Sequence, residues 1–314
     1  MDTERIIPPS WIEDGDVIFL ELDDDELKTV TDYIEITRHI QEIKQLFDVF
    51  RYDMGAMLRV YNLNNSDAID RNQPASKEYD DRIEINALLI SFISAGKTLT
   101  DSLKVCIEKS NSQSDEFAEF LSKIYDSSFY YRLLVRMRDY AQHGHLPISV
   151  VDNKFCFDIS QILFTPHFNL NKAVKSEMYK IHQQLSKQGQ PAHQVCTLCV
   201  AEYTACIAEI YCTFYQYIQK DFLSCCRDMR ALLKKSPEYT VQPNARYDGY
   251  LFYVAEEMGH AFDTDDDPIQ MFNAFKDEAV RFYEDETREL KLLNESVRFI
   301  PLEPNGVGED SKTK

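Results

Sequence analysis

The stretch YIEITRHIQEIKQLFDVFRYDMGAMLRVY, residues 33–61, carries the strongest structural signal in the chain. Its apolar side chains recur in alternating steps of three and four positions: Tyr33, Ile36, Ile40, Ile43, Phe47, Phe50, Met54, Met57 and Tyr61. Because an α-helix turns once every 3.6 residues, these positions form one apolar stripe along a helix of about eight turns. A helix of this length with one apolar face needs helical neighbours, so the stretch predicts a bundle.

A second stripe of the same kind follows the polar stretch at residues 62–81. It consists of Ile85, Leu89, Phe92, Gly96, Leu99, Leu103 and Cys106. Gly96 has no side chain to pack, which predicts that a neighbouring helix comes close at this position. A third helix is expected to begin near Ser114 or Asp115, to bend around residues 125–129 and to continue to Ala141.

The hydrophobic period then changes. Residues 146–160 alternate apolar and polar side chains around Asp152-Asn153-Lys154, which predicts a small β-hairpin. Helices are expected at about 172–186 and 191–235, and a last helix is expected to start with Asp267 as its cap and Pro268 in its first turn and to run to about Phe299. The predicted fold class is all-α: a long-helix antiparallel bundle with a small β-hairpin inserted after the third helix, plus a smaller helical C-terminal part.

The expected division of the chain follows from composition. We expect an acidic N-terminal segment at residues 1–27, the helical bundle at 28–235, a C-terminal helical extension at 236–300 and a disordered tail at 301–314. The net charge of the 314 residues is −19, but the first 27 residues contribute −9 and residues 262–314 contribute −7, so the part between them carries only −3. The acidic ends and the nearly neutral middle of the chain therefore argue against a broad basic patch as the source of affinity for nucleic acid.

The sequence shows no targeting signal, so we expect a cytoplasmic protein. No apolar run approaches the ~20 residues that a membrane span needs, and the acidic N-terminus has no basic or apolar region of a signal peptide. We therefore expect no membrane partner. The eight cysteines are expected to be buried thiols, since disulfides belong to exported proteins.

Two short motifs have the residue types of known sites without their full pattern. Residues 94–101, SAGKTLTD, contain the Gly-Lys-Thr that ends a phosphate-binding loop, but Ser91 stands where that loop requires its first glycine. The segment also lies inside a helical stripe. Cys196 and Cys199 form a single C-x2-C pair, and a structural zinc site needs a second pair or matching histidines. We expect no metal there.

Two further groups of potential metal ligands also lack the full pattern of a metal site. Glu257 and His260 make one Glu-x-x-His step, whereas di-metal bundles use two such steps and two more carboxylates. The run at residues 263–267, DTDDD, lacks the glycine and the distal glutamate of a calcium loop. No metal or cofactor is expected.

Residues 136–147, RMRDYAQHGHLP, place two arginines, an aspartate and two histidines at the end of the third helix. Gly144 suits a left-handed helix cap. Arg138 is followed directly by Asp139 and, five positions later, by His143. On these residues the sequence resembles the HEPN superfamily, helical-bundle proteins that include many metal-independent ribonucleases of toxin and defence systems. The signature of that family is an arginine followed four to six residues later by histidine, with a polar residue commonly after the arginine.

The resemblance implies an endoribonuclease that cuts RNA without metal and leaves a 2′,3′-cyclic phosphate. His143 would act as the general acid or base, Arg138 would stabilise the developing phosphorane, and Asp139 would orient one of the two. Tyr140, Arg136 and His145 are the candidate substrate-binding residues. The resemblance also implies a homodimer with two motifs facing one cleft, and an antitoxin or other neutralising protein as a partner.

Several alternatives stay open at the level of the sequence. Arg136 also has the required spacing to His143, and His145 has it from Arg138, so the pair is not uniquely defined. The same surface suits a catalytically silent module that binds a nucleotide or a protein partner. A plain structural bundle, in which the histidines only favour the negative end of the helix dipole, is the third alternative.

Overall fold

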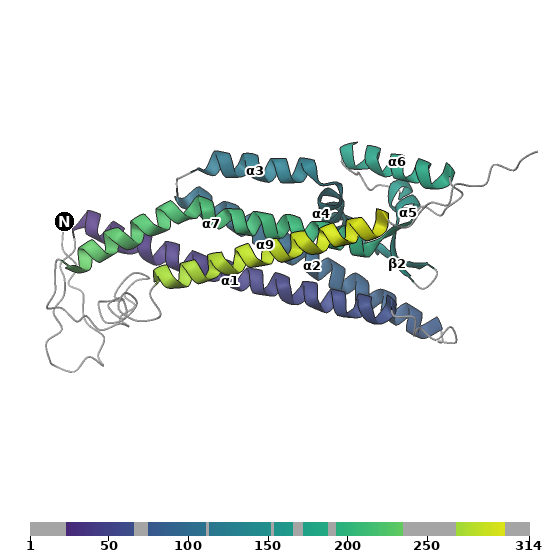
Figure 1. The fold of residues 1–314 in the computed structure, drawn as a ribbon, viewed down its shortest axis with the longest axis horizontal. Coiled ribbons are helices and arrows are strands. Elements are labelled where there is room, and N and C mark those ends of the chain that lie inside the picture. Colours follow the sequence, from purple (N-terminus) through teal and green to yellow (C-terminus); the bar gives the residue numbers. More distant parts are fainter. Residues whose placement is uncertain are drawn as a thin grey trace, which may run out of the picture.

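The computed structural model describes residues 23–65, 75–110, 113–151, 154–165, 172–187, 193–234 and 268–298. Most of these residues are helical, so the all-α class is confirmed (Figure 1). The helices are α1 (Asp24–Asn65), α2 (Ala75–Ser110), α3 (Ser114–Ser127), α4 (Phe129–Gln142), α5 (Ile159–Phe164), α6 (Lys172–Lys187), α7 (Cys196–Lys234) and α9 (Pro268–Arg298).

The four long helices α1, α2, α7 and α9 lie side by side and form the body of the molecule (Figure 1). The apolar stripes predicted for the first two helices face this core: Tyr33, Ile36, Ile40, Ile43, Phe47, Phe50, Met57, Ile85, Leu89, Phe92, Leu99, Leu103 and Cys106 are all buried. Each fully buried large side chain stabilises the fold by about 1.5–3 kcal/mol. The long hydrophobic periods thus determine the bundle.

The C-terminal helix α9 belongs to the same core. It begins at Pro268, as the sequence predicts, while the expected cap Asp267 lies outside the described residues. The Phe272 ring stacks on Phe222 of α7 at 4.4 Å between centroids, and Phe282 meets Phe47 of α1 edge-on at 5.1 Å. Helix α9 therefore packs against both α7 and α1 (Figure 1).

The bend predicted around residues 125–129 is a complete break at Ser128, which separates α3 from α4. The Ser128 hydroxyl caps α4 by accepting a hydrogen bond from the Tyr131 amide at 3.0 Å. We call this break between α3 and α4 the joint. The buried Arg132 guanidinium of α4 links it to the end of α3 by donating to the carbonyl oxygens of Tyr125 and Asp126. It also donates to Glu177 of α6 at 2.7 Å, so this one side chain joins three helices.

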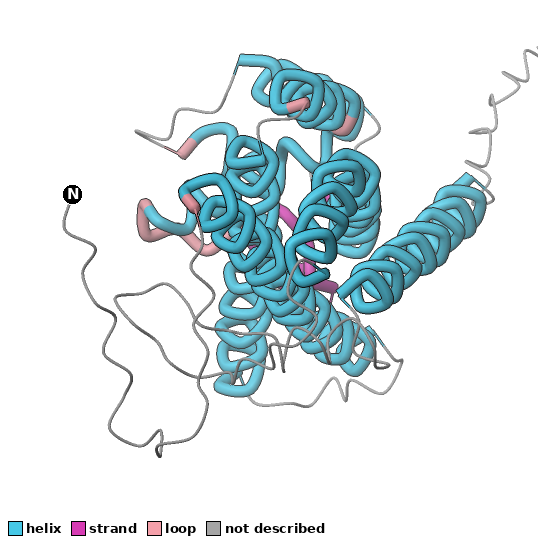
Figure 2. Tube along the Cα trace, turned by 90° about the vertical axis from the view of Figure 1, so that its left-hand side faces the viewer, coloured by secondary structure: helices cyan, strands magenta, loops and turns pink. Residues whose placement is uncertain are grey.

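The predicted hairpin consists of β1 (Ile148–Val151) and β2 (Lys154–Asp158), paired with Ile148 opposite Phe157. The buried side chain of Asn86 ties it to α2, because its amide group exchanges two hydrogen bonds of 2.9 Å with the Ile148 backbone. Figure 2 shows the small sheet among the helices.

Two short elements differ from the prediction. The helix expected from residue 191 begins only at Cys196, because residues 193–195 form a third strand, β3, on the free edge of β2. Helix α5 follows β2 directly, where Asp158 caps it by accepting from the Gln161 amide at 2.9 Å.

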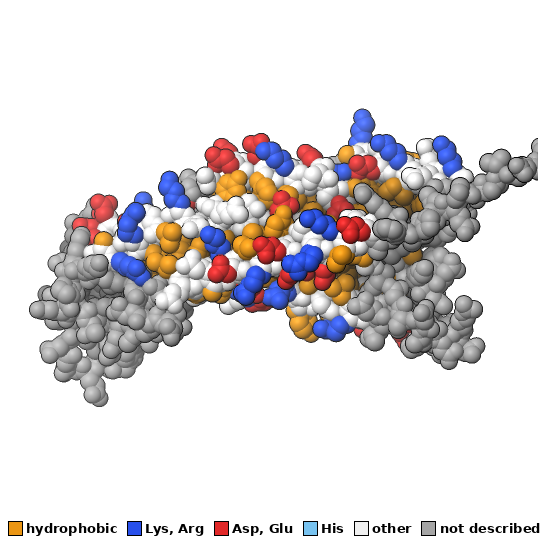
Figure 3. Space-filling view, in the orientation of Figure 1, with side chains coloured by type: hydrophobic (Ala, Val, Ile, Leu, Met, Phe, Trp, Pro, Cys, Tyr) orange, Lys and Arg blue, Asp and Glu red, His pale blue; other side chains and the backbone are white. Residues whose placement is uncertain are grey.

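Charged side chains of both signs are interspersed over the described part of the face in Figure 3. No described helix combines the length and the apolar character that a membrane crossing requires. The acidic residues 1–22 and the tail from residue 299 lie outside the described part of the chain.

Candidate functional site

The end of α4 has the cap geometry that Gly144 predicts. Gly144 has a φ of +85° and its amide donates to the Ala141 carbonyl at 2.9 Å. The His145 amide donates back to the Tyr140 carbonyl at 3.4 Å, which completes a Schellman motif with His143 as the cap residue. The turn therefore fixes the backbone of both histidines.

The three candidate residues nearest this turn have different surroundings. His143 is exposed. The Tyr140 side chain is fully buried, and its hydroxyl lies 3.1 Å from the Thr165 hydroxyl, so its ring faces are not accessible to a base. The His145 ring stacks on Tyr140 at 4.9 Å between centroids and is partly buried by that contact. Of these three side chains, His143 is the one presented to solvent.

Asp139 pairs with Arg136, not with Arg138 or His143. The Arg136 guanidinium donates to the Asp139 carboxylate at 3.1 Å, and both side chains are about one third exposed, at 33% and 39%. Burial lowers the pKa of Arg136, but electrostatic interactions and hydrogen bonds with Tyr125 and Asp139 outweigh it, and the net shift is upward. The carboxylate therefore holds Arg136 in place.

Arg138 differs from the other candidate cation in its surroundings. Unlike Arg136, it forms no hydrogen bond or ion pair with any residue that the structure describes; the Nε atoms of both arginines are buried without an acceptor. It lines a hollow of about 300 Å³ between α2, α3 and α4, which we call the arginine pocket. The pocket is lined by Ile93, Lys97, Tyr125, Val135, Arg136, Arg138 and Asp139.

Lys97 is the charged pocket residue that the sequence did not assign to the site, and Ile93, Tyr125 and Val135 were not assigned to it either. It belongs to the Gly-Lys-Thr segment that failed the phosphate-loop pattern, and it pairs with Asp101 one turn further along α2. Lys97 lies within helix α2 and not in a phosphate-binding loop. It comes close to Arg136 and Arg138 because α2 packs beside α4. The adjacent Gly96 gives no signal for it, because it marks the approach of α7, whereas the pocket lies between α2, α3 and α4.

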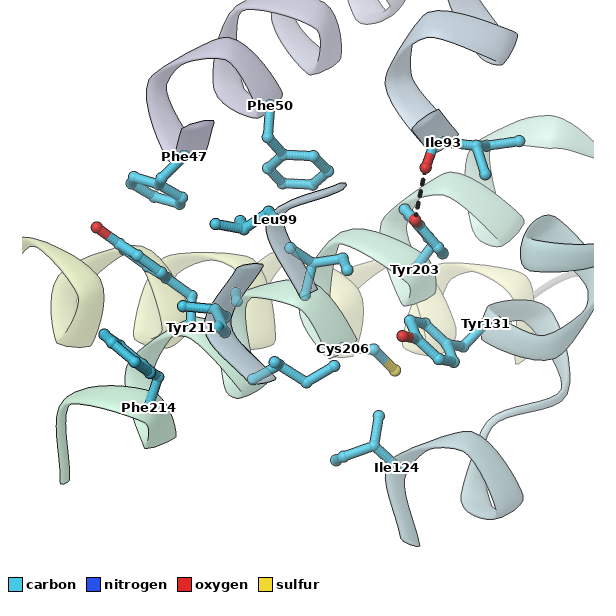
Figure 4. Packing of buried hydrophobic residues seen from close by; sticks show 14 of the residues in the cluster. Phe47, Phe50, Ile93, Leu99, Ile124, Tyr131, Tyr203, Cys206, Tyr211 and Phe214 are labelled. Carbon is cyan, nitrogen blue, oxygen red and sulfur yellow. Dashed lines mark hydrogen bonds between the residues drawn. The ribbon is translucent and has the colours of Figure 1, made fainter. Parts of the chain in front are cut away.

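The approach at Gly96 is close, as predicted. A Cβ added to Gly96 would lie 2.5 Å from the Tyr203 hydroxyl oxygen of α7, so no larger residue fits without movement. The same hydroxyl donates to the Ile93 carbonyl at 3.2 Å (Figure 4). Burial raises the pKa of Tyr203 well above its usual value. This contact fixes the part of α2 that carries Ile93 and Lys97.

The remaining sequence candidates can be placed only in part. Cys199 and Cys206 are buried, and burial raises the pKa of the Cys206 thiol to about 12. Glu257, His260 and residues 263–267 lie outside the described residues. Within the described ranges, no group of three or more His, Cys, Asp or Glu side chains could hold a metal ion.

The arrangement of the site thus has two parts. Arg136, Arg138 and Asp139 line the arginine pocket together with Lys97, while His143 lies at the end of the helix and does not line that pocket.

Comparison of the chain with models of protein families, with curated proteins and with solved structures gave no match.

Proposed function

We propose that this protein is a helical module that binds the phosphate group of a nucleotide or an RNA in the arginine pocket, with Arg138 as the main contact. The observation that carries the proposal is the guanidinium of Arg138, unpaired among the described residues, beside Arg136 and Lys97 in a hollow of about 300 Å³. This volume is at the lower end of the ~300–1,000 Å³ range of small-molecule sites.

Physical chemistry favours an anion at this position. A guanidinium presents its N–H donors in a planar fork that matches two phosphate oxygens, and it stays charged at every physiological pH. A partly buried cation with an unsatisfied donor loses hydration without compensation. A phosphate group would supply the missing acceptors, while Asp139 keeps Arg136 oriented toward the same pocket.

The position of His143 favours binding over cleavage within one chain. It lies five positions after Arg138, which on a helix corresponds to about 7.5 Å along the axis and about 140° around it. Among the residues that the structure describes, a phosphate in the arginine pocket would therefore meet two arginines and a lysine but no histidine. Proton transfer needs an acid or base within hydrogen-bond reach of the reacting oxygen.

The second candidate function is the metal-independent endoribonuclease of the toxin or defence type that the HEPN resemblance implies. The observation in its favour is the exposure of His143 at the end of α4, where a second copy of the chain could receive it. In such a homodimer one protomer would supply Arg138 and the other His143, and the product would carry a 2′,3′-cyclic phosphate. An antitoxin or other neutralising protein would be the expected partner.

Two assays on one set of variants test both functions. Fluorescence anisotropy measures the binding of a labelled single-stranded RNA, and gel analysis in EDTA measures its cleavage. Arg138→Ala should weaken binding about 10- to 150-fold, the equivalent of losing ~1.5–3 kcal/mol of charge-assisted hydrogen bonding. Arg38→Ala is the matched control, because that arginine is exposed and pairs with Glu42 on α1.

The outcomes separate the candidates. Binding that is lost in Arg138→Ala, kept in His143→Ala and accompanied by no cleavage supports the binding module. Cleavage that disappears in His143→Ala, by about 10²–10⁴ in rate, supports the ribonuclease. If Arg138→Ala binds as tightly as the unmodified protein, the arginine pocket is not the binding site.

A further inference from the structure

The positive charge of the arginine pocket is concentrated at one point. Lys97 is paired with Asp101, and Arg136 is paired with Asp139. Arg138 has no such partner among the described residues, so the pocket and its paired carboxylates together carry one excess positive charge. A ligand in the pocket would therefore meet this excess charge at Arg138.

Within the described ranges, no track of free cations continues from the pocket along its helices. The next cation on each helix is already paired with a carboxylate: Lys104 with Glu108 at 3.5 Å on α2, Lys123 with Glu119 at 2.9 Å on α3, and Arg132 of α4 with Glu177 at 2.7 Å. Proteins that follow a nucleic-acid strand line its path with a positively charged groove and aromatic platforms. The pocket therefore suits one phosphate group and not a series of them.

The charge of a phosphate depends on its substitution. A phosphomonoester carries about −1.5 to −2 at neutral pH, whereas an internal phosphodiester carries one negative charge and extends in two directions. Against the −19 of the whole chain, each further phosphate of a bound strand adds repulsion without a new cation to meet it. One localised cationic site in an acidic protein thus favours the monoester.

We infer that the arginine pocket recognises a phosphomonoester, the terminal phosphate of a nucleotide or of an RNA end, in preference to an internal phosphodiester. The inference rests on the proposed phosphate-binding function. Lys97 supplies the second contact: its ammonium group swings from the exposed Asp101 toward the ligand, while Arg136 keeps its bond to Asp139. Lys97 is suited to this exchange because its side chain and that of Asp101 are 38% and 58% exposed, where an ion pair contributes little stability.

The experiment compares one oligoribonucleotide with a 5′-phosphate, a 3′-phosphate or hydroxyls at both ends, together with adenosine 5′-monophosphate as a competitor. The protein is the full chain, either unmodified or carrying Arg138→Ala, Lys97→Ala or Lys104→Ala. Lys104 is the matched control, because it makes the same i,i+4 ion pair on the same helix. A phosphate at one end should tighten binding by about tenfold or more, and Lys97→Ala should remove most of that difference while Lys104→Ala keeps it.

Comparison of the three oligoribonucleotides with the nucleotide competitor also distinguishes the source of the phosphate. Competition by adenosine 5′-monophosphate at equal concentration identifies a free nucleotide, and an advantage confined to the phosphorylated oligonucleotides identifies an RNA end; both support the inference. Equal, Arg138-dependent binding of all three oligonucleotides overturns the inference but leaves the proposed function in place. Absence of any Arg138-dependent binding overturns both.

Discussion

Replacing Gly96 by alanine is expected to destabilise the protein, although alanine is the better helix former. In an open helix the change would stabilise by about 0.8–1 kcal/mol. Here the new Cβ would lie 2.5 Å from the Tyr203 hydroxyl oxygen and 3.0 Å from its Cε1. Neither helix can give way freely, because Tyr203 is fully buried and stacks on Tyr131 at 5.3 Å.

The magnitude follows from three contributions. Overpacking a tight core costs about 1–3 kcal/mol, and displacing the Tyr203 hydroxyl from the Ile93 carbonyl costs about 1 kcal/mol more. The gain in helix propensity offsets about 1 kcal/mol. We therefore expect a net loss of about 2 kcal/mol in the free energy of unfolding, measured by urea denaturation followed by circular dichroism.

A double-mutant cycle isolates the cause. Tyr203→Phe removes the oxygen that the new Cβ would meet, so Gly96→Ala should cost at least about 1 kcal/mol less when it is combined with Tyr203→Phe. Gly55 on α1 is the control, because a Cβ there would meet only the Arg59 side chain at 3.8 Å. An equal cost with and without the Tyr203→Phe change, or a Gly96→Ala variant as stable as the unmodified protein, would refute the close approach of α2 and α7.

Three other predictions concern the joint, the pH dependence and the assembly. Arg132→Ala should lower stability by about 2 kcal/mol or more in urea denaturation, because it removes a buried guanidinium that binds two carbonyl oxygens of α3 and the Glu177 carboxylate; unchanged stability would show that the joint does not depend on it. Burial and two acidic neighbours raise the pKa of Glu286 to about 7, so its contribution to stability is complete below about pH 4 and is lost as the pH rises through about 7. Glu286→Gln should therefore flatten the pH dependence of the unfolding free energy, and an unaltered profile would contradict this. Light scattering at micromolar concentration should give a homodimer if the ribonuclease candidate is correct, and a single species of 36.7 kDa would count against it.

The fold was predictable where one periodic pattern runs over many residues. The stripes of α1 and α2, the start of α9 at Pro268 and the cap at Gly144 all follow from local rules on spacing, proline and glycine. The third strand was missed because three residues at 193–195 give no periodic signal, and their pairing with β2 depends on a partner distant in sequence. Helix α5 was missed because six residues are too short for a helical period.

The site was predictable only in its residue types. The sequence places Arg136, Arg138 and Asp139 near one another, but it does not decide which arginine the carboxylate binds. The spacing of three residues brings Asp139 to Arg136 on the same face, whereas an adjacent residue points about 100° away. Lys97 could not be assigned, because its place in the arginine pocket depends on how α2 packs against α4, which no local pattern encodes.

The docking of α9 has a consequence for the order in which the protein folds. Its ion pair between Glu278 and Arg51 joins positions 227 residues apart, and its aromatic contacts reach both Phe47 and Phe222. The surface on which α9 packs is made by α1 and α7 together, so it forms only after these two helices have packed. We therefore expect α9 to dock late, after the folding transition state. Destabilising changes in α9 should then speed unfolding and leave the refolding rate nearly unchanged, since only contacts already present in the transition state govern that rate. Helix α9, the last helix among the described residues, would set how long the native state persists and not how quickly it forms.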